Sequence, residues 1–344
     1  MDLKQNVSLR DYSTMRLGGT ATYLCDVHNR QEVEQAIQWA HTHSLPMIMI
    51  GGGSNIVWTD GGFNGLVIVN KILRFETFEE DSENVYMTVG AGEIWDSVVN
   101  KSVELGLTGI EALSLIPGSV GATPIQNVGA YGQEIADTLV SVEAYDLKDK
   151  KYLTIPNADC GFGYRTSRFK SKDKGRFLIT AITLHLRRGN PTPPFYSAVQ
   201  DYFVSHKINQ PTAADLRHIV IDIRTHKLPD PARVANCGSF FANPIITDDQ
   251  LNDLLAHYPN ISYWQQDNRH YKLAAAWLVE QAGFKATHDK QTGMATWPTQ
   301  ALVLVNEHAR NTADLLAFKQ KIVKKVQSMF GITLQQEPEL LGHN

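Results

Sequence analysis

Residues 116–132 constrain the fold more than any other part of this sequence. The stretch reads Ile-Pro-Gly-Ser-Val-Gly-Ala-Thr-Pro-Ile-Gln-Asn-Val-Gly-Ala-Tyr-Gly. It holds too much glycine and proline for a regular helix or strand, and it is too apolar for a loop that faces solvent. A segment of this composition typically lines a binding site and surrounds the bound molecule.

A second glycine-rich turn precedes it. The apolar run 47–50 is typical of a buried strand and stops at Gly51-Gly52-Gly53. Glycine allows positive φ and close backbone approach, and successive N–H groups in such a turn bind anions. The third glycine of the Rossmann pattern is absent, and 56–58 read as extended chain. Taken alone, the Gly51-Gly52-Gly53 turn is equally well a plain structural turn. Two apolar glycine loops together, however, predict a binding site for one long dinucleotide.

The rest of the chain alternates between helical and strand-like segments. Apolar periodicity and capping residues predict a helix from Asn29 that ends before Leu45, and further helices over 93–105, 212–227, 272–281 and 311–330. Period-two alternation or short apolar runs predict strands at 47–50, 66–69, 85–89, 141–147, 177–186 and 301–306. Leu228-Pro229-Asp230-Pro231 ends a helix and marks a domain boundary.

Composition excludes several classes of protein. With 344 residues, 43% of them hydrophobic, the chain can form two or three domains. The net charge is −4 with both signs interleaved, so no nucleic-acid partner is predicted. No apolar run approaches the roughly 20 residues of a membrane-spanning helix, and the N-terminus lacks a signal sequence. A cytoplasmic protein with no membrane association is predicted.

The cysteines and histidines indicate no metal site. Cys25, Cys160 and Cys237 are far apart and form no Cys-x-x-Cys or Cys/His cluster. His41 and His43 are separated by two positions, which does not place them on one helix face. Neither a disulfide nor a bound metal is predicted.

Four motifs in one order resemble a known family, the UDP-N-acetylenolpyruvoylglucosamine reductases. They are Gly-Gly-Gly-Ser-Asn at 51–55, the 116–132 stretch, Cys-Gly-Phe-Gly-Tyr-Arg at 160–165, and Gly-Ser-Phe-Phe-Ala-Asn-Pro at 238–244. The resemblance implies an α+β fold: an FAD-binding fold of the vanillyl-alcohol-oxidase type in two α/β subdomains, and a C-terminal α+β substrate-binding domain. The implied boundaries are 1–70 with 331–344 returning to it, 71–225, and 226–330.

The resemblance also implies the reaction and its participants. Non-covalent FAD would take a hydride from NADPH and pass it to the enolpyruvyl group of UDP-N-acetylglucosamine enolpyruvate, giving UDP-N-acetylmuramate for peptidoglycan. Negative charge then develops beside the substrate carboxylate, and a proton must reach the neighbouring carbon. Such chemistry needs a preorganised cationic or hydrogen-bonding clamp, worth roughly 3 kcal/mol per donor, and a positioned proton donor.

Three residues match the catalytic positions of the family. Arg165 offers a permanent charge and a planar fork suited to a carboxylate. Ser239 matches the proton donor and is preferred by register over the nearby Cys237. Glu337 matches the carboxylate by its spacing from Leu334 and Gly342, whereas Glu339, two positions on, is expected to be an exposed tail residue.

Further residues match binding positions. Tyr196 resembles the tyrosine that closes over substrate in the subclass with this loop insertion, Lys227 resembles a phosphate partner, and Asn243 and Gln300 resemble contacts to the nucleotide-sugar. Tyr164 fits a core position and a substrate contact equally. The implied FAD contacts are Gly51, Gly52, Gly53, Ser54 and Asn55 from the first loop, and Ile116, Pro117, Gly118, Ser119, Gly121, Asn127 and Gly129 from the second.

Two other functions remain open. A flavin-dependent alcohol or lactone oxidase of the same fold would share the glycine loops but would have no use for Arg165, Ser239 and Glu337. A non-catalytic nucleotide-binding protein would share only the loops. The sequence leaves the oligomeric state open, with a monomer favoured.

Overall fold

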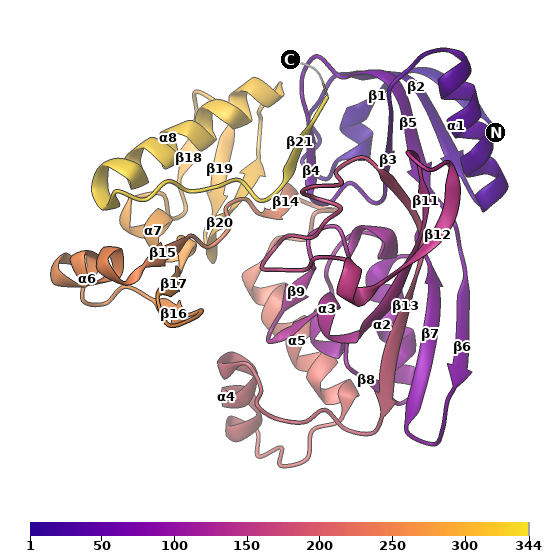
Figure 1. Cartoon of the computed structure of the whole chain (residues 1–344). Helices are drawn as coiled ribbons and strands as arrows, with labels where there is room; N and C mark the ends of the chain where they lie inside the picture. The colour runs from indigo at the N-terminus through magenta and orange to yellow at the C-terminus, as the bar shows by residue number, and fades with distance from the viewer. Residues whose placement is uncertain (343–344) are drawn as a thin grey trace. The chain divides into compact units, whose positions relative to one another are not determined.

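The chain forms two compact units in a computed structural model that describes residues 1–342. The first unit contains residues 1–7, 21–52 and 64–225, and the second contains 8–20, 53–63 and the chain from 226 onwards. Figure 1 labels the elements of both units.

A four-stranded sheet with the order β1-β2-β5-β3 and one helix form the N-terminal part of the first unit. Asn29 begins helix α1 because its side chain accepts a hydrogen bond from Glu32 N at 2.9 Å. The helix buries the predicted apolar stripe in one core with strands β2 and β5, and β3 pairs in parallel with β5. The bounds are Leu3–Ser8 for β1, Thr20–Val27 for β2, Arg30–Thr42 for α1, Met47–Ile50 for β3 and Phe63–Asn70 for β5.

The first unit also contains a second sheet, which has six strands (Figure 1). Its order is β12-β11-β13-β7-β6, with β8 paired to β13. Helix α2 buries Trp95, Val98 and Val99 in the core beside this sheet and ends before Gly106, whose φ is 71°. The bounds are Phe75–Glu79 for β6, Asn84–Gly90 for β7, Trp95–Glu104 for α2, Leu107–Thr108 for β8, Leu139–Asp146 for β11, Lys151–Pro156 for β12 and Phe177–Arg188 for β13.

The glycine-rich stretch and two helices complete this unit. The stretch contains only short elements, followed by β10 and α3, as its composition predicted. Helices α4 and α5 pack on each other through Val199, Phe203, Leu216, Ile219 and Val220, and α4 had not been predicted. The bounds are Gly129–Ala130 for β9, Gln133–Glu134 for β10, Ile135–Thr138 for α3, Ser197–Ser205 for α4 and Ala213–Lys227 for α5.

An ion pair between the buried Asp146 carboxylate and Arg176 makes the stability of the first unit depend on pH. The carboxylate of Asp146 is 1% exposed and accepts hydrogen bonds from Arg176 Nε at 3.0 Å and Nη2 at 2.7 Å. These bonds lower the pKa of Asp146 to about 2. Because the folded pKa lies below the unfolded value of about 3.9, the stabilisation is fully present above pH 4 and is lost as the pH falls towards 2.

We therefore expect Arg176→Met to lower the thermal unfolding midpoint at pH 7 by roughly 5 °C. The difference from wild type should shrink between pH 4 and pH 2, because Asp146 becomes protonated in both proteins. Circular dichroism melts across this range measure it. Arg233→Met is the control, since its 3.9 Å pair with Asp230 is exposed. A difference that stays constant down to pH 2 would contradict the assignment.

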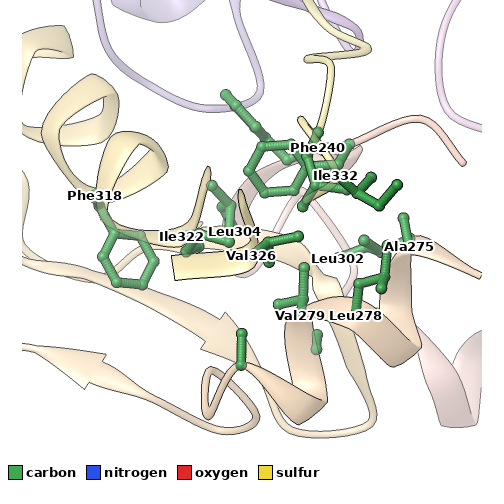
Figure 2. Close-up of a cluster of buried hydrophobic side chains, with 14 of the residues drawn as sticks. Phe240, Ala275, Leu278, Val279, Leu302, Leu304, Phe318, Ile322, Val326 and Ile332 are labelled. Carbon is green, nitrogen blue, oxygen red and sulfur yellow. The ribbon is translucent and has the colours of Figure 1, made fainter. Parts of the chain in front are cut away.

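The second unit is built around a four-stranded sheet with the order β14-β20-β19-β18. Figure 2 shows its core, where Phe318, Ile322 and Val326 of α8 meet Leu302 and Leu304 of β20 and residues of α7. Asn311 begins α8 by accepting from Asp314 N, and Gly331 ends it with φ 68°. The bounds are Ala235–Ser239 for β14, Ala275–Gln281 for α7, His288–Asp289 for β18, Met294–Trp297 for β19, Gln300–Asn306 for β20 and Thr312–Phe330 for α8.

Smaller elements extend this unit. A three-stranded sheet has the order β15-β17-β16, and β21 pairs in parallel with β4. The bounds are Ile56–Trp58 for β4, Ile245–Thr247 for β15, Asp248–His257 for α6, Tyr263–Gln265 for β16, His270–Leu273 for β17 and Glu339–Leu341 for β21.

The helix predicted over 272–281 is wrong at its start. Lys272 and Leu273 belong to strand β17, where Lys272 pairs with Ile245 and Trp264. The helix begins only at Ala275, whose backbone N–H donates to the side chain of Asn243 at 2.9 Å. Cross-strand pairing, which periodicity does not detect, decides the conformation of the first residues.

Within residues 1–342, no helix has the length and apolar character needed to cross a bilayer. In the same range, no group of three or more His, Cys, Asp or Glu side chains is placed to hold a metal ion.

Candidate active site

The two glycine loops touch each other within the first unit. A Cβ added to Gly51 would lie 1.9 Å from Ser119 Oγ, and one added to Gly52 would lie 3.1 Å from the Cα of Gly118. A side chain at residue 51 would displace the Ser119 hydroxyl, and one at residue 52 would crowd the backbone at Gly118. The turn after β3 and the turn that begins residues 119–122 therefore form one continuous surface, although 67 residues separate Gly52 from Ser119.

Ser119 carries the feature that points to a ligand at this surface. Its side chain is buried, with 7% of the residue exposed, and Ser119 Oγ has no hydrogen-bond partner in the structure. A buried hydroxyl without a partner costs about 1–3 kcal/mol, so such an atom in a native site calls for an explanation. A phosphate oxygen of a dinucleotide is an acceptor that would satisfy the hydroxyl, and the FAD predicted from sequence fits this donor.

The second loop is held by the segment 160–170. Asn127 is fully buried, accepts from Ala136 N at 2.9 Å and donates to Gly163 O at 3.3 Å. Ser167 Oγ donates to Ile125 O at 2.6 Å. Both ends of the Asn127 amide are thus used by the protein, so its observed contacts shape the loop.

Arg165 lies against this loop. Its Nη2 donates to Gly129 O at 2.6 Å, and a Cβ on Gly129 would lie 3.2 Å from Arg165 Nη1. Arg165 has φ 53° in the tight turn between Gly163 and Thr166. Its guanidinium lies 5.2 Å from the ring centre of Tyr164, which is half-buried. The turn therefore fixes a permanent positive charge at the edge of the glycine-rich stretch.

Tyr196 also lies beside the second loop. The residue is 44% exposed, and its ring meets the ring of Tyr131 edge to face, with centres 5.5 Å apart. Burial raises the pKa of Tyr131, and Arg224 of α5 faces its hydroxyl. Sequence reasoning did not single out Tyr131 or Arg224, although Tyr131 is part of the quoted Gly-Ala-Tyr-Gly motif. Arg224, 93 residues away, gave no signal.

In the second unit, the structure brings Ser239 and Glu337 together. Ser239 ends β14, Phe240 N donates to Leu302 O at 2.7 Å, and Glu337 N donates to Phe240 O at 2.9 Å. Two residues further along, Ala242 N donates to Gln335 O at 3.0 Å, so the two segments stay paired. The carboxylate segment thus lies along the chain that follows Ser239. Arg165 lies in the first unit, and its convergence with these two residues stays a prediction.

The neighbouring groups distinguish between the alternatives at these positions. Cys237 is 3% exposed, and its pKa is raised by burial and then by the Glu337 carboxylate, so this thiol is a poor proton donor. Glu339 is not the exposed tail residue that was expected. It is half-buried in β21, where it pairs with Ile56 and its N–H donates to Asn55 O at 3.0 Å.

The three remaining predicted substrate contacts lie in the second unit. Lys227 is the exposed last residue of α5, and its carbonyl accepts from Thr299 Oγ1 at 2.8 Å, next to Gln300. Gln300 begins β20, and Asn243 accepts from Ala275 N at the start of α7. The predicted FAD residues Gly53, Ser54 and Asn55 also belong to this unit, whereas Gly51 and Gly52 belong to the first.

Comparisons with known proteins agree with these observations. The FAD binding domain family matches residues 21–155, and the family of UDP-N-acetylenolpyruvoylglucosamine reductase C-terminal domains matches residues 230–341. UDP-N-acetylenolpyruvoylglucosamine reductase of Ralstonia nicotianae is 37% identical over 98% of this chain and 99% of its own. That of Cupriavidus pinatubonensis is 37% identical over 99% of both chains.

A solved structure shows the same fold. The UDP-N-acetylenolpyruvylglucosamine reductase of Thermus caldophilus superposes with a TM-score of 0.68 at 23% identity, over 99% of both chains. The predicted fold class, with an FAD-binding part and a C-terminal α+β domain, is confirmed. Because relatives 37% identical match nearly the whole length, this chain belongs to the UDP-N-acetylenolpyruvoylglucosamine reductase family.

Proposed function

We propose that this chain is an NADPH-dependent flavoenzyme that reduces the enolpyruvyl group of UDP-N-acetylglucosamine enolpyruvate to the lactyl ether. The product is UDP-N-acetylmuramate, a precursor of peptidoglycan. The observation that carries the proposal is the contact between the two glycine loops around the buried, unpartnered Ser119 hydroxyl. This contact lies within residues 21–155, the region that matches FAD binding domains.

The glycine loops are the proposed holder of FAD, which supplies the hydride when bound. Gly51 and Gly52 keep side chains out of the contact with Gly118 and Ser119, and Ser119 supplies a hydroxyl donor. The other FAD residues predicted from sequence are proposed to complete the cradle. NADPH is proposed to use the substrate pocket, because the sequence holds no separate dinucleotide fingerprint.

Three side chains are proposed to act on the substrate. Arg165 would bind the carboxylate of the enolpyruvyl group and stabilise the negative charge that develops on it. Ser239 would donate a proton to the adjacent carbon, which is far more basic than an alkoxide. Glu337, on the chain that pairs beside Ser239, would help to move that proton.

The nucleotide part of the substrate is assigned to other residues. Tyr196 is proposed to close over the substrate, Lys227 to bind a phosphate, Asn243 and Gln300 to make further polar contacts, and Tyr164 to contact the substrate near Arg165. A cytoplasmic location and a monomer are proposed as well. A nucleotide-activated sugar and NADPH are both metabolites of that compartment.

The test is to follow the flavin spectrum of purified protein through both halves of the reaction. We expect NADPH to bleach the flavin, UDP-N-acetylglucosamine enolpyruvate to restore it, and initial-rate lines to be parallel, as in ping-pong kinetics. Fast reoxidation by air without turnover of the enolpyruvyl substrate would favour the oxidase. Protein that stays colourless after FAD is added would favour the non-catalytic alternative.

A further inference from the structure

A mostly buried arginine of helix α5, Arg217, holds the segment that leads into the second glycine loop. Arg217 Nη1 donates to Asp96 Oδ1 at 2.7 Å and Nη2 donates to Asp96 Oδ2 at 3.1 Å, which makes the pair bidentate. Its Nε donates to Asn100 Oδ1 at 3.1 Å. The side chain of Arg217 is 12% exposed and that of Asp96 is 28% exposed.

Through Ser114 and Asp96, Arg217 is bonded to the segment that leads into the loop. Arg217 Nη1 also donates to the fully buried Ser114 Oγ at 2.8 Å, and Asp96 Oδ1 accepts from Leu115 N at 2.5 Å. Leu115 has φ 57°, a left-handed conformation that is unfavourable for a residue with a branched side chain. The hydrogen bond from Leu115 N to Asp96 holds the backbone in this conformation. The loop begins at this turn.

The start of helix α2 secures the same segment at two further points. Trp95 Nε1 donates to Leu113 O at 3.0 Å, and Trp95 N donates to Gly118 O at 3.1 Å. Burial alone would raise the pKa of Asp96, but the hydrogen bonds from Arg217 and Leu115 outweigh it and lower the pKa. Asp96 therefore stays charged at neutral pH, and its pair with Arg217 stays intact.

We propose that Arg217 is a positioning residue for FAD, because through Asp96 and Ser114 it fixes the conformation in which the loop presents Gly118 and Ser119. Arg217 acts through these two residues, and no contact of its own with the flavin is needed. The inference rests on the proposed binding of FAD by residues 116–121. Arg217 would hold the loop in its binding conformation before FAD arrives, so less conformational entropy would be lost on FAD binding.

The experiment measures FAD release from the holoenzyme on dilution, by the rise in flavin fluorescence. We expect Arg217→Met to weaken FAD binding by about tenfold or more and Arg217→Lys, which keeps the charge but loses the fork, by less. Arg176→Met is the matched control, because it breaks another part-buried bidentate pair in the same unit, with Asp146, that has no hydrogen bond to the loop. It should lower the unfolding midpoint but leave the FAD dissociation constant at the wild-type value.

Two results would overturn the inference: wild-type FAD affinity in Arg217→Met, or equal loss of affinity in Arg176→Met. If Arg217→Met does not fold, Ser114→Ala decides, since it removes only hydroxyl contacts; we expect about threefold weaker binding, and an unchanged constant refutes the proposal. Wild-type protein that binds no FAD would instead refute the proposed function. Wild-type binding with insensitive variants would refute the positioning role alone.

Discussion

We expect Ser239→Ala to slow reoxidation of the reduced flavin by the enolpyruvyl substrate by roughly 10²–10⁴-fold, while NADPH should still reduce the flavin at nearly the wild-type rate. The two half-reactions separate because only the second needs a proton on the substrate carbon. The neighbouring Cys237 cannot replace the hydroxyl, since burial and the Glu337 carboxylate raise the pKa of its thiol. Stopped-flow absorbance of the flavin measures each half-reaction.

The control for this variant is Ser328→Ala on an exposed position of α8, which should leave both rates unchanged. Thermal melts of both variants test for loss of folding. Equal slowing of the two half-reactions by Ser239→Ala, or no slowing at all, would contradict the role of Ser239 as proton donor.

Glu337→Gln is expected to slow the same step by at least about a hundredfold, whereas Glu339→Gln stays within a fewfold of wild type. The backbone N–H of Glu337 donates to the carbonyl of Phe240, the residue after Ser239. The Glu337 carboxylate also contributes to the raised pKa of the buried Cys237 thiol. Glu339 belongs to β21 and pairs with Ile56 of β4. Both substitutions keep the shape of the side chain and remove only its charge.

The measurement is again substrate-dependent flavin reoxidation, at several pH values. The two variants are controls for each other, because they lie two positions apart on either side of the buried Pro338. If Glu339→Gln were the slower variant, Glu339 would be the carboxylate and the spacing argument from Leu334 and Gly342 would be wrong.

Local signals in the sequence located most of the elements around the site. Asn29 and Asn311 are N-caps whose side chains accept a backbone hydrogen bond at the start of a helix. The two glycine loops were recognisable from their composition. The start of α7 was wrong because pairing of Lys272 with Ile245 overrides helical periodicity. Contacts that depend on the fold gave no local signal.

Two arrangements near the site illustrate this limit. Arg217 reaches Asp96 across 121 positions of sequence, and Tyr131 reaches Arg224 across 93. Neither pair shows any spacing pattern, since each is created by packing of α5 near the glycine-rich stretch. Resemblance could assign Arg165, Ser239 and Glu337, but it offered nothing for residues outside the shared motifs.

The second unit draws its core from three separate pieces of chain, and this has a consequence for synthesis. Met15, Leu17 and Val57 pack in one cluster with residues of α8, and β4 finds its partner only in β21. A nascent chain emerging from the ribosome therefore has every residue of the first unit long before residues 339–341 are translated. Residues 8–20 and 53–63 cannot complete the second unit until residues 339–341 have been made, so a chain cut before residue 339 would have a complete first unit and a β4 without its partner strand.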